Sequence, residues 1–414
     1  MIQYKKYNLD NGLILIVHQD ASTPIATINL LYNVGSRHED PDQTGFAHLF
    51  EHLMFEGSVN IPAYDIPLQK AGGENNAFTS NDITNYYLTL PLQNIETAFW
   101  LESDRMLGLN LTKEKLEIQK NVVIEEFNQR YLNQPYGDAY LHLRPMAYKV
   151  HPYRWPTIGK ELSHIKNATL EDAKDFFYHH YAPNNAILTV VANKEPEIIK
   201  ELVEKWFGAI PRRDIAHREI PAEPPQTQPR KQTIANKEVP HNVIFKAYHI
   251  CDRNHADYHA TDLISDILAN GKSSRLYQTM VKEKKVFSHI DAYVTGDIDP
   301  GLLMINGSLA NGTIMDKAEK ELTNELTKLA NENVSENELE KVKNKVEATH
   351  EISLTSTLYK AMNLSYYELL GDAGIVNNEM EAYRKVAPED IQRISAKIFS
   401  ENNCSTLYYY SKKL

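Results

Sequence analysis

Residues 45–57 read Gly-Phe-Ala-His-Leu-Phe-Glu-His-Leu-Met-Phe-Glu-Gly, and at helical spacing this stretch carries two stripes of side chains. One stripe is apolar and can pack on a sheet: Phe46, Leu49, Phe50 and Leu53. The other places His48 and His52 one turn apart, so that both imidazoles can reach one metal ion. We therefore predict a helix from about residue 44 to residue 55, with a core-facing side and half of a metal site.

Glu51 lies between the two histidines and gives this half-site a chemical role. Neutral imidazole suits zinc, and a catalytic zinc ion commonly has three protein ligands and an open position for water. A neighbouring carboxylate can take the proton from that water as a general base. Histidines on helices are more often solvated than ligating, but the second stripe ends in Phe55. Both faces are thus expected to be buried, and buried polar side chains need partners, which favours the metal site.

The third ligand is expected to be a carboxylate from another helix. The best candidate is the stretch 120–127, Lys-Asn-Val-Val-Ile-Glu-Glu-Phe, where two acids follow an apolar run that must face inward. Helical phase alone does not separate Glu125 from Glu126. If the stretch held no ligand, both acids would be solvated.

The composition is that of an ordinary soluble globular protein without a nucleic-acid partner. The 414 residues are 42% hydrophobic and 24% charged, and the length favours two domains. The balance of 44 basic to 55 acidic residues, without a basic run, argues against binding to a phosphate backbone. Two cysteines, one in each half, predict no disulfide framework and suit a reducing compartment. Neither a signal peptide nor a membrane-spanning run is visible, so we expect a cytoplasmic protein.

The second half of the chain looks like a diverged copy of the first. Residues 169–172 and 181–185 pair with residues 387–390 and 399–403 at a constant offset, and the metal stretch overlays residues 265–271 at a similar one. In the copy, the positions of the two histidines and the glutamate are taken by Asp262, Ser265 and Asp266. Only the first repeat is therefore predicted to hold a metal.

Five prolines between residues 211 and 231 mark an extended linker between the repeats. We predict an α+β fold with two similar domains, in each of which helices pack on one face of a sheet. The predicted boundaries are 1–212 for the metal-carrying domain, 213–232 for the linker and 233–414 for the domain without the motif.

The motif His48-x-x-Glu51-His52 resembles that of the inverted-motif zinc peptidases, the group of pitrilysin, insulin-degrading enzyme and mitochondrial processing peptidase. In that family a glutamate within a helix follows the motif at a characteristic distance, and Glu126 lies at that distance. The resemblance implies that His48, His52 and Glu126 hold one zinc ion per chain and that Glu51 is the general base. It covers the whole chain and implies the short two-domain branch, in which two subunits close around a chamber.

Residues 72–80 resemble the edge strand of that family, to which a substrate peptide adds as an extra β-strand. The resemblance assigns substrate binding to the following residues: Asn76, Ala77, Phe78 and Thr79. Strand addition uses main-chain hydrogen bonds, so one such site can cleave many different peptides. The alternative is a turn that leads into an ordinary strand.

Three positions depart from the family pattern. Lys282 and His289 stand where active members usually carry an Arg and a Tyr that contact the substrate. Lys lacks the bidentate fork of Arg, and His differs in reach from a phenol. We therefore expect a heterodimer in which a homologous zinc-less subunit supplies the pair, with a homodimer that uses Lys282 and His289 as the alternative. Gln119 stands where many relatives have an acid that supports the ligands, and it keeps the hydrogen bond without the charge.

The residues and the resemblance together predict a zinc metalloendopeptidase subunit that hydrolyses short or unfolded peptides. Two other interpretations stay open: a non-catalytic scaffold subunit of the same fold, and a dedicated processing peptidase for one peptide substrate. The complete set of predicted ligands argues against a scaffold, whereas the departures at residues 282 and 289 keep that interpretation open. A processing peptidase would have the same site.

Overall fold

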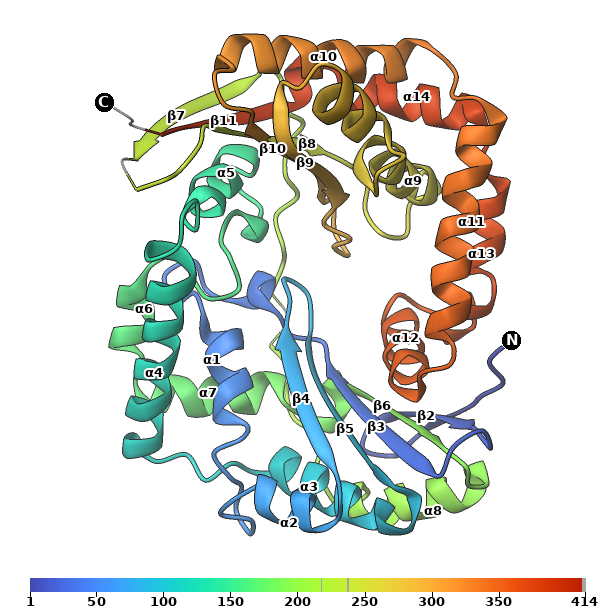
Figure 1. Cartoon of the computed structure of the whole chain (residues 1–414). Coiled ribbons are helices and arrows are strands. Elements are labelled where there is room, and N and C mark those ends of the chain that lie inside the picture. Colours follow the sequence, from blue (N-terminus) through green and yellow to red (C-terminus); the bar gives the residue numbers. More distant parts are fainter. Residues whose placement is uncertain (217, 237, 412–414) are drawn as a thin grey trace. The chain divides into compact units, whose positions relative to one another are not determined.

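The computed structural model describes residues 1–216, 218–236 and 238–411. The chain divides into two compact units, and each is built around one β-sheet (Figure 1). Unit 1 comprises Met1–Phe127, Trp155–Ile220 and Glu351–Asn378, and unit 2 comprises Asn128–Arg154, Pro221–His350 and Glu379–Leu414. The predicted α+β class is confirmed, with helices and strands intermixed along the sequence.

The sheet of unit 1 has six strands within the described residues, and β4 lies at one edge of it. The spatial order is β1 (Lys5–Asn8), β2 (Ile14–Gln19), β6 (Ala186–Ala192), β3 (Ile25–Tyr32), β5 (Thr84–Pro91) and β4 (Glu74–Thr79). Neighbouring strands are antiparallel except for β2 and β6, which run parallel. Every residue of β6 is buried, as expected for a central strand that is covered on both faces.

The helices of unit 1 surround this sheet. They are α1 (Phe46–Leu53), α2 (Asp65–Lys70), α3 (Ile95–Leu107), α4 (Lys113–Phe127), α6 (Leu162–Asn167), α7 (Leu170–His180), α8 (Pro196–Phe207) and α12 (Thr357–Leu369). The capped start predicted for α7 is confirmed: the Thr169 hydroxyl accepts the N–H of Asp172 at 3.2 Å, and the Asp172 carboxylate accepts the N–H of Thr169 at 2.9 Å.

Helix α12 covers the face of the first sheet opposite to α1. Successive side chains of a strand point to opposite faces. Tyr32 of β3 contacts Tyr181, on the side of α1, with 4.9 Å between ring centroids. Asn29, on the other face, donates from its amide to the Ser365 hydroxyl of α12 at 2.9 Å. The prediction of helices on one face is therefore incomplete, because an apolar second face also needs cover.

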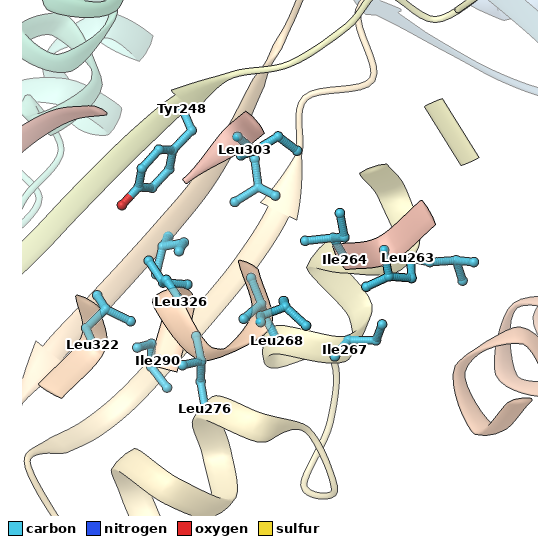
Figure 2. Close-up of a cluster of buried hydrophobic side chains, with 14 of the residues drawn as sticks. Tyr248, Leu263, Ile264, Ile267, Leu268, Leu276, Ile290, Leu303, Leu322 and Leu326 are labelled. Carbon is cyan, nitrogen blue, oxygen red and sulfur yellow. The ribbon is translucent and has the colours of Figure 1, made fainter. Parts of the chain in front are cut away.

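The sheet of unit 2 has five strands within the described residues. The spatial order is β7 (Arg230–Asn236), β11 (Cys404–Ser411), β8 (Val243–His249), β10 (Leu302–Leu309) and β9 (Phe287–Val294), with only β7 and β11 parallel. Its helices are α5 (Ala139–Ala147), α9 (Tyr258–Ala269), α10 (Met315–Asn331), α11 (Glu336–Ser353), α13 (Glu379–Lys385) and α14 (Pro388–Ile398). Figure 2 shows the main core, where Leu263 and Ile267 of α9 and Leu322 of α10 gather with Leu303 of β10.

Helix α5 packs on the second face of this sheet, where Leu143 joins Phe245 of β8 and Leu407 of β11 in a separate apolar core. The predicted contiguous boundaries, 1–212 and 233–414, therefore differ from the units of the structure. Residues 128–154 belong to unit 2 and residues 351–378 to unit 1. A proline-rich segment marks where the repeats join, but it does not say which sheet an amphipathic helix will cover.

No helix in the described part of the chain combines the length and the apolar composition that crossing a lipid bilayer requires.

Candidate metal centre

Helix α1 is held at its start by a buried carboxylate. Glu39 is 2% exposed and accepts the backbone N–H groups of Gly45 at 2.9 Å and Ala47 at 2.8 Å. Burial raises the pKa of Glu39 to about 8, although these hydrogen bonds oppose the shift. Gly45 has φ +93°, and a Cβ there would lie 2.6 Å from the carbonyl oxygen of Ile158, so only glycine fits. The role of Glu39 has no local sequence signature, and we did not predict it.

The predicted apolar stripe of α1 is buried. Phe46, Leu49, Phe50 and Leu53 are each at most 3% exposed. Phe50 stacks on Tyr181 with 5.4 Å between ring centroids. This packing fixes the rotation of α1 about its axis and so directs its second stripe toward α4.

Three potential ligand atoms converge between α1 and α4. The Nε2 atoms of His48 and His52 lie 3.6 Å and 3.5 Å from Oε2 of Glu126. All three residues offer atoms within 4.8 Å of one another, and no other group of His, Cys, Asp or Glu among the described residues does so. Glu125, the other candidate, is exposed. The structure thus brings together the residues that the resemblance implied.

The donor set and its spacing fit zinc. Two imidazole nitrogens and one carboxylate oxygen are ligands that zinc commonly takes, at about 2.0–2.2 Å. Two such atoms on a tetrahedral ion are about 3.3–3.6 Å apart, by simple trigonometry from those bond lengths. The observed separations of 3.5 Å and 3.6 Å are close to that edge. These separations are also longer than a good N–H···O hydrogen bond. A shared metal ion therefore describes the arrangement better than direct hydrogen bonds between Glu126 and the two histidines.

Glu51 lies beside this cluster and is oriented by the adjacent strand. The hydroxyl of Thr79 donates to Oε2 of Glu51 at 2.7 Å. Burial raises the pKa of Glu51, and the hydrogen bond from Thr79 acts in the opposite direction. The carboxylate therefore has a fixed orientation and an environment that increases its affinity for a proton.

Strand β4 lies at the edge of the sheet, so some of its backbone groups face away from β5. Opposed residues in an antiparallel pair alternate between hydrogen-bonded and open. The N–H of Ser80 donates to the carbonyl of Ile83 at 2.8 Å, which makes the pairs at Thr79 and Ala77 the open kind. The backbone groups of Thr79 and Ala77 thus face away from β5. Consistently, the N–H of Ala77 donates to the Asn76 side-chain oxygen at 2.8 Å and not to β5.

Two further predicted residues of this strand can be placed. Asn76 and Phe78 are both exposed, Phe78 at 39%, which is unusual for a phenylalanine. Side chains alternate along the strand, so these two point to the face opposite Thr79 and Glu51. A role in substrate binding for residues 76–79 remains a proposal.

The other predicted residues lie outside the cluster. Gln119 donates from its amide to the Glu56 carboxylate, and among the described residues its oxygen has no hydrogen-bond donor. Lys282 and His289 belong to unit 2 and are exposed. His289 on β9 lies 3.5 Å from the Asp291 carboxylate.

The copied stretch in unit 2 uses its polar residues for hydrogen bonds within the fold. The hydroxyl of Tyr383 donates to the Asp262 carboxylate at 2.6 Å. The amide of Asn270 donates to Asp266, and the Ser265 hydroxyl donates to the carbonyl of Asp262 at 2.9 Å. Among the described residues, the group of three potential ligands lies in the first repeat.

A buried ion pair lies beside Phe55, at the end of the stripe that carries His48 and His52. No sequence pattern predicted this pair. Arg105 and Glu102 of α3 are each 1% exposed and form two parallel hydrogen bonds of 2.8 Å. The guanidinium centre lies 5.5 Å from the ring of Phe55, just beyond α1, and 4.3 Å from the ring of Tyr86. An arginine enclosed by aromatic rings is a favourable cation–π arrangement.

Known proteins resemble this chain in sequence and in fold. The zinc protease PqqE of Helicobacter pylori is 29% identical over 98% of this chain and 92% of its own length. A crystal structure of a protease from Helicobacter pylori superposes with a TM-score of 0.93 at 28% identity, covering 99% of this chain and 100% of that one. The mitochondrial-processing peptidase subunit beta of Saccharomyces cerevisiae is 28% identical over 49% of this chain and 44% of that subunit.

Two family models match successive parts of the chain. The model described as insulinase (peptidase family M16) matches residues 14–159, which include the metal cluster. The model described as peptidase M16 inactive domain matches residues 167–346. With both domains of the family matched and a solved relative sharing the whole fold, the chain belongs to peptidase family M16, whose members include zinc proteases, and fits its short two-domain branch.

Proposed function

We propose that this chain is a zinc-dependent endopeptidase subunit that hydrolyses short or unfolded peptides. His48, His52 and Glu126 hold one zinc ion, and Glu51 is the general base. The observation that carries the proposal is the convergence of three ligand atoms beside an oriented carboxylate, at the open edge of a sheet. The family relationship supports the same chemistry.

Each part of the site has a task in peptide hydrolysis. When bound, zinc supplies a Lewis acid that polarises the scissile carbonyl and makes a water molecule more acidic. Glu51 takes the proton of the attacking water and passes it to the nitrogen of the leaving amine. The Thr79 hydroxyl holds the Glu51 carboxylate in position for both transfers.

The edge strand explains why unfolded peptides are the expected substrates. The carbonyls of Ala77 and Thr79 face away from β5 and can accept hydrogen bonds from an extended peptide, and the N–H of Ala77 can exchange its bond to the Asn76 side chain for one to that peptide. Such pairing requires the substrate backbone to be free of its own secondary structure. Because main-chain groups supply the bonds, the strand itself imposes little side-chain specificity.

Zinc binding is the first expected result. Purified chain analysed by inductively coupled plasma mass spectrometry should contain about one zinc per chain. Mutation of a residue that only hydrogen-bonds to a metal ligand typically lowers metal affinity by roughly 10–100-fold. Because Glu126 is itself a proposed ligand, Glu126→Gln should lower zinc affinity by more than that. Its neighbour Glu125→Gln is the control, since Glu125 is exposed on the same helix and should leave the affinity unchanged. Wild-type chain that takes up no zinc would contradict the proposed centre, and would favour the scaffold interpretation.

We further propose that a homologous subunit without the metal motif completes the active enzyme. The support is that Lys282 and His289 replace the Arg and Tyr implied by the resemblance, and that a relative is a subunit of a processing peptidase. The chain alone, loaded with zinc, should then cleave a fluorogenic peptide poorly, and adding such a partner should raise kcat/KM. Full activity without a partner would refute this, and loss of that activity in Lys282→Ala or His289→Ala would show that this chain supplies both contacts.

A further inference from the structure

Unit 1 contains a cavity of about 300 Å³ on the apolar side of α1. Its lining comes from the segment before α1, from one side of α7 and from residues 216 and 218. It shares no residue with the proposed zinc centre. Its contact with α1 is Phe46, the first residue of that helix, and Glu39, which caps the helix, also lines it.

The cavity carries an excess of negative charge. Its lining includes Asp40, Asp172 and Asp175, against a single arginine, Arg218. That guanidinium is already committed, since it donates to the carbonyl of Glu39 at 2.9 Å and to the Asp40 carboxylate at 3.3 Å. The Asp175 carboxylate is exposed on α7 and makes no hydrogen bond or ion pair within the described part of the chain. A cation entering the cavity would thus find uncompensated charge.

A buried histidine also lines the cavity. His180 is 7% exposed, and among the described residues no group forms a hydrogen bond with its ring nitrogens. Its ring packs on Phe176 with 4.5 Å between centroids. Burial lowers the pKa of His180 to about 4, so the ring is neutral at pH 7 and offers one acceptor and one donor. Because the ring lines the cavity, a bound ligand can form a hydrogen bond with it.

The arrangement suits an organic cation better than a metal ion. Only His48, His52 and Glu126 among the described residues bring three ligand atoms together, so the cavity lacks a convergent set. It does place the aromatic rings of Phe46 and Phe176 beside its acids, which is the setting for a cation–π contact. Its volume is at the small end of ligand pockets, which suits a molecule of side-chain size.

We propose that this cavity binds a small organic cation, an alkylammonium or alkylguanidinium, with Asp172 and Asp175 as the charge complement and His180 as the buried hydrogen-bonding partner. Because Phe46 is the first residue of α1 and Glu39 caps that helix, an occupant would stabilise the beginning of the metal-bearing helix. Binding should therefore raise the thermal unfolding midpoint of the full chain.

The test uses two probes of equal shape, butylguanidinium and its neutral counterpart butylurea. Isothermal titration calorimetry on the zinc-loaded full chain should give saturable 1:1 binding of butylguanidinium, with a Kd near or below about 1 mM. Butylurea should bind at least about tenfold more weakly, since it lacks the charge. Absence of saturable butylguanidinium binding, or equal binding of butylurea, would overturn the proposal.

Variants locate the binding to this cavity. Asp175→Asn should weaken butylguanidinium binding about fivefold or more, and His180→Phe, which keeps an aromatic ring, should also weaken it. Glu171→Gln is the matched control, because Glu171 is exposed on the same helix, loses the same charge and does not line the cavity. If Asp175→Asn binds no more weakly than Glu171→Gln, the probe binds elsewhere and the proposal fails, whatever the stability of His180→Phe.

Discussion

Replacing Glu51 with Gln is expected to lower kcat for peptide hydrolysis by about 10²–10⁴-fold, the usual contribution of a positioned general base. Gln keeps the size of the side chain and can still accept the hydroxyl hydrogen bond from Thr79, but it cannot take a proton. Because Glu51 is not one of the three converging ligands, the variant should retain zinc. Activity is measured on a fluorogenic peptide, and metal content on the same sample.

The paired readout separates the role of Glu51 from general damage. Loss of activity with zinc retained supports the general base, whereas loss of both would mean that the variant disturbs the centre. Glu125→Gln, which removes an exposed carboxylate from α4, should keep both activity and zinc. A Glu51→Gln chain that turns over peptide at the wild-type rate would refute the role given to Glu51.

Replacing Arg105 with Met is expected to destabilise the chain by about 3–5 kcal/mol, the cost of leaving a buried charge unpaired. Both partners of the pair are 1% exposed, so Glu102 would remain in the interior without its counterion. The hydroxyl of Tyr64 also donates to Glu102, but one neutral donor cannot replace a bidentate guanidinium. The measurement is the shift of the urea unfolding transition assigned to unit 1.

An exposed pair of the same unit provides the comparison. Lys205 and Glu96 have side chains that are 58% and 47% exposed, so Lys205→Met should change stability by no more than about 1 kcal/mol. The double variant Arg105→Met/Glu102→Leu should recover much of the loss, because it removes the orphaned charge as well. An Arg105→Met chain as stable as Lys205→Met would show that the buried pair contributes little.

The metal half-site could be predicted because its information is local. His48 and His52 are one helical turn apart, so they reach the same point wherever α1 lies, and the apolar stripe of the same helix says which side faces the core. Glu126 was different, since helical phase did not separate it from Glu125. The contact between α4 and α1 makes that choice, by burying one acid beside the histidines and leaving the other exposed.

Sequence periodicity was likewise sufficient for the α+β class, because the alternation of apolar residues is set within each element. The location of α5 on the second sheet, the cap that Glu39 places on α1 and the pairing of Arg105 with Glu102 follow from which surfaces meet in the folded chain. A helix with an apolar stripe can cover any apolar face, and a buried charge can pair with any counterion within reach. Which sheet a helix covers and which charges pair therefore depend on distances in the folded chain. The spacing of residues along the sequence does not determine those distances.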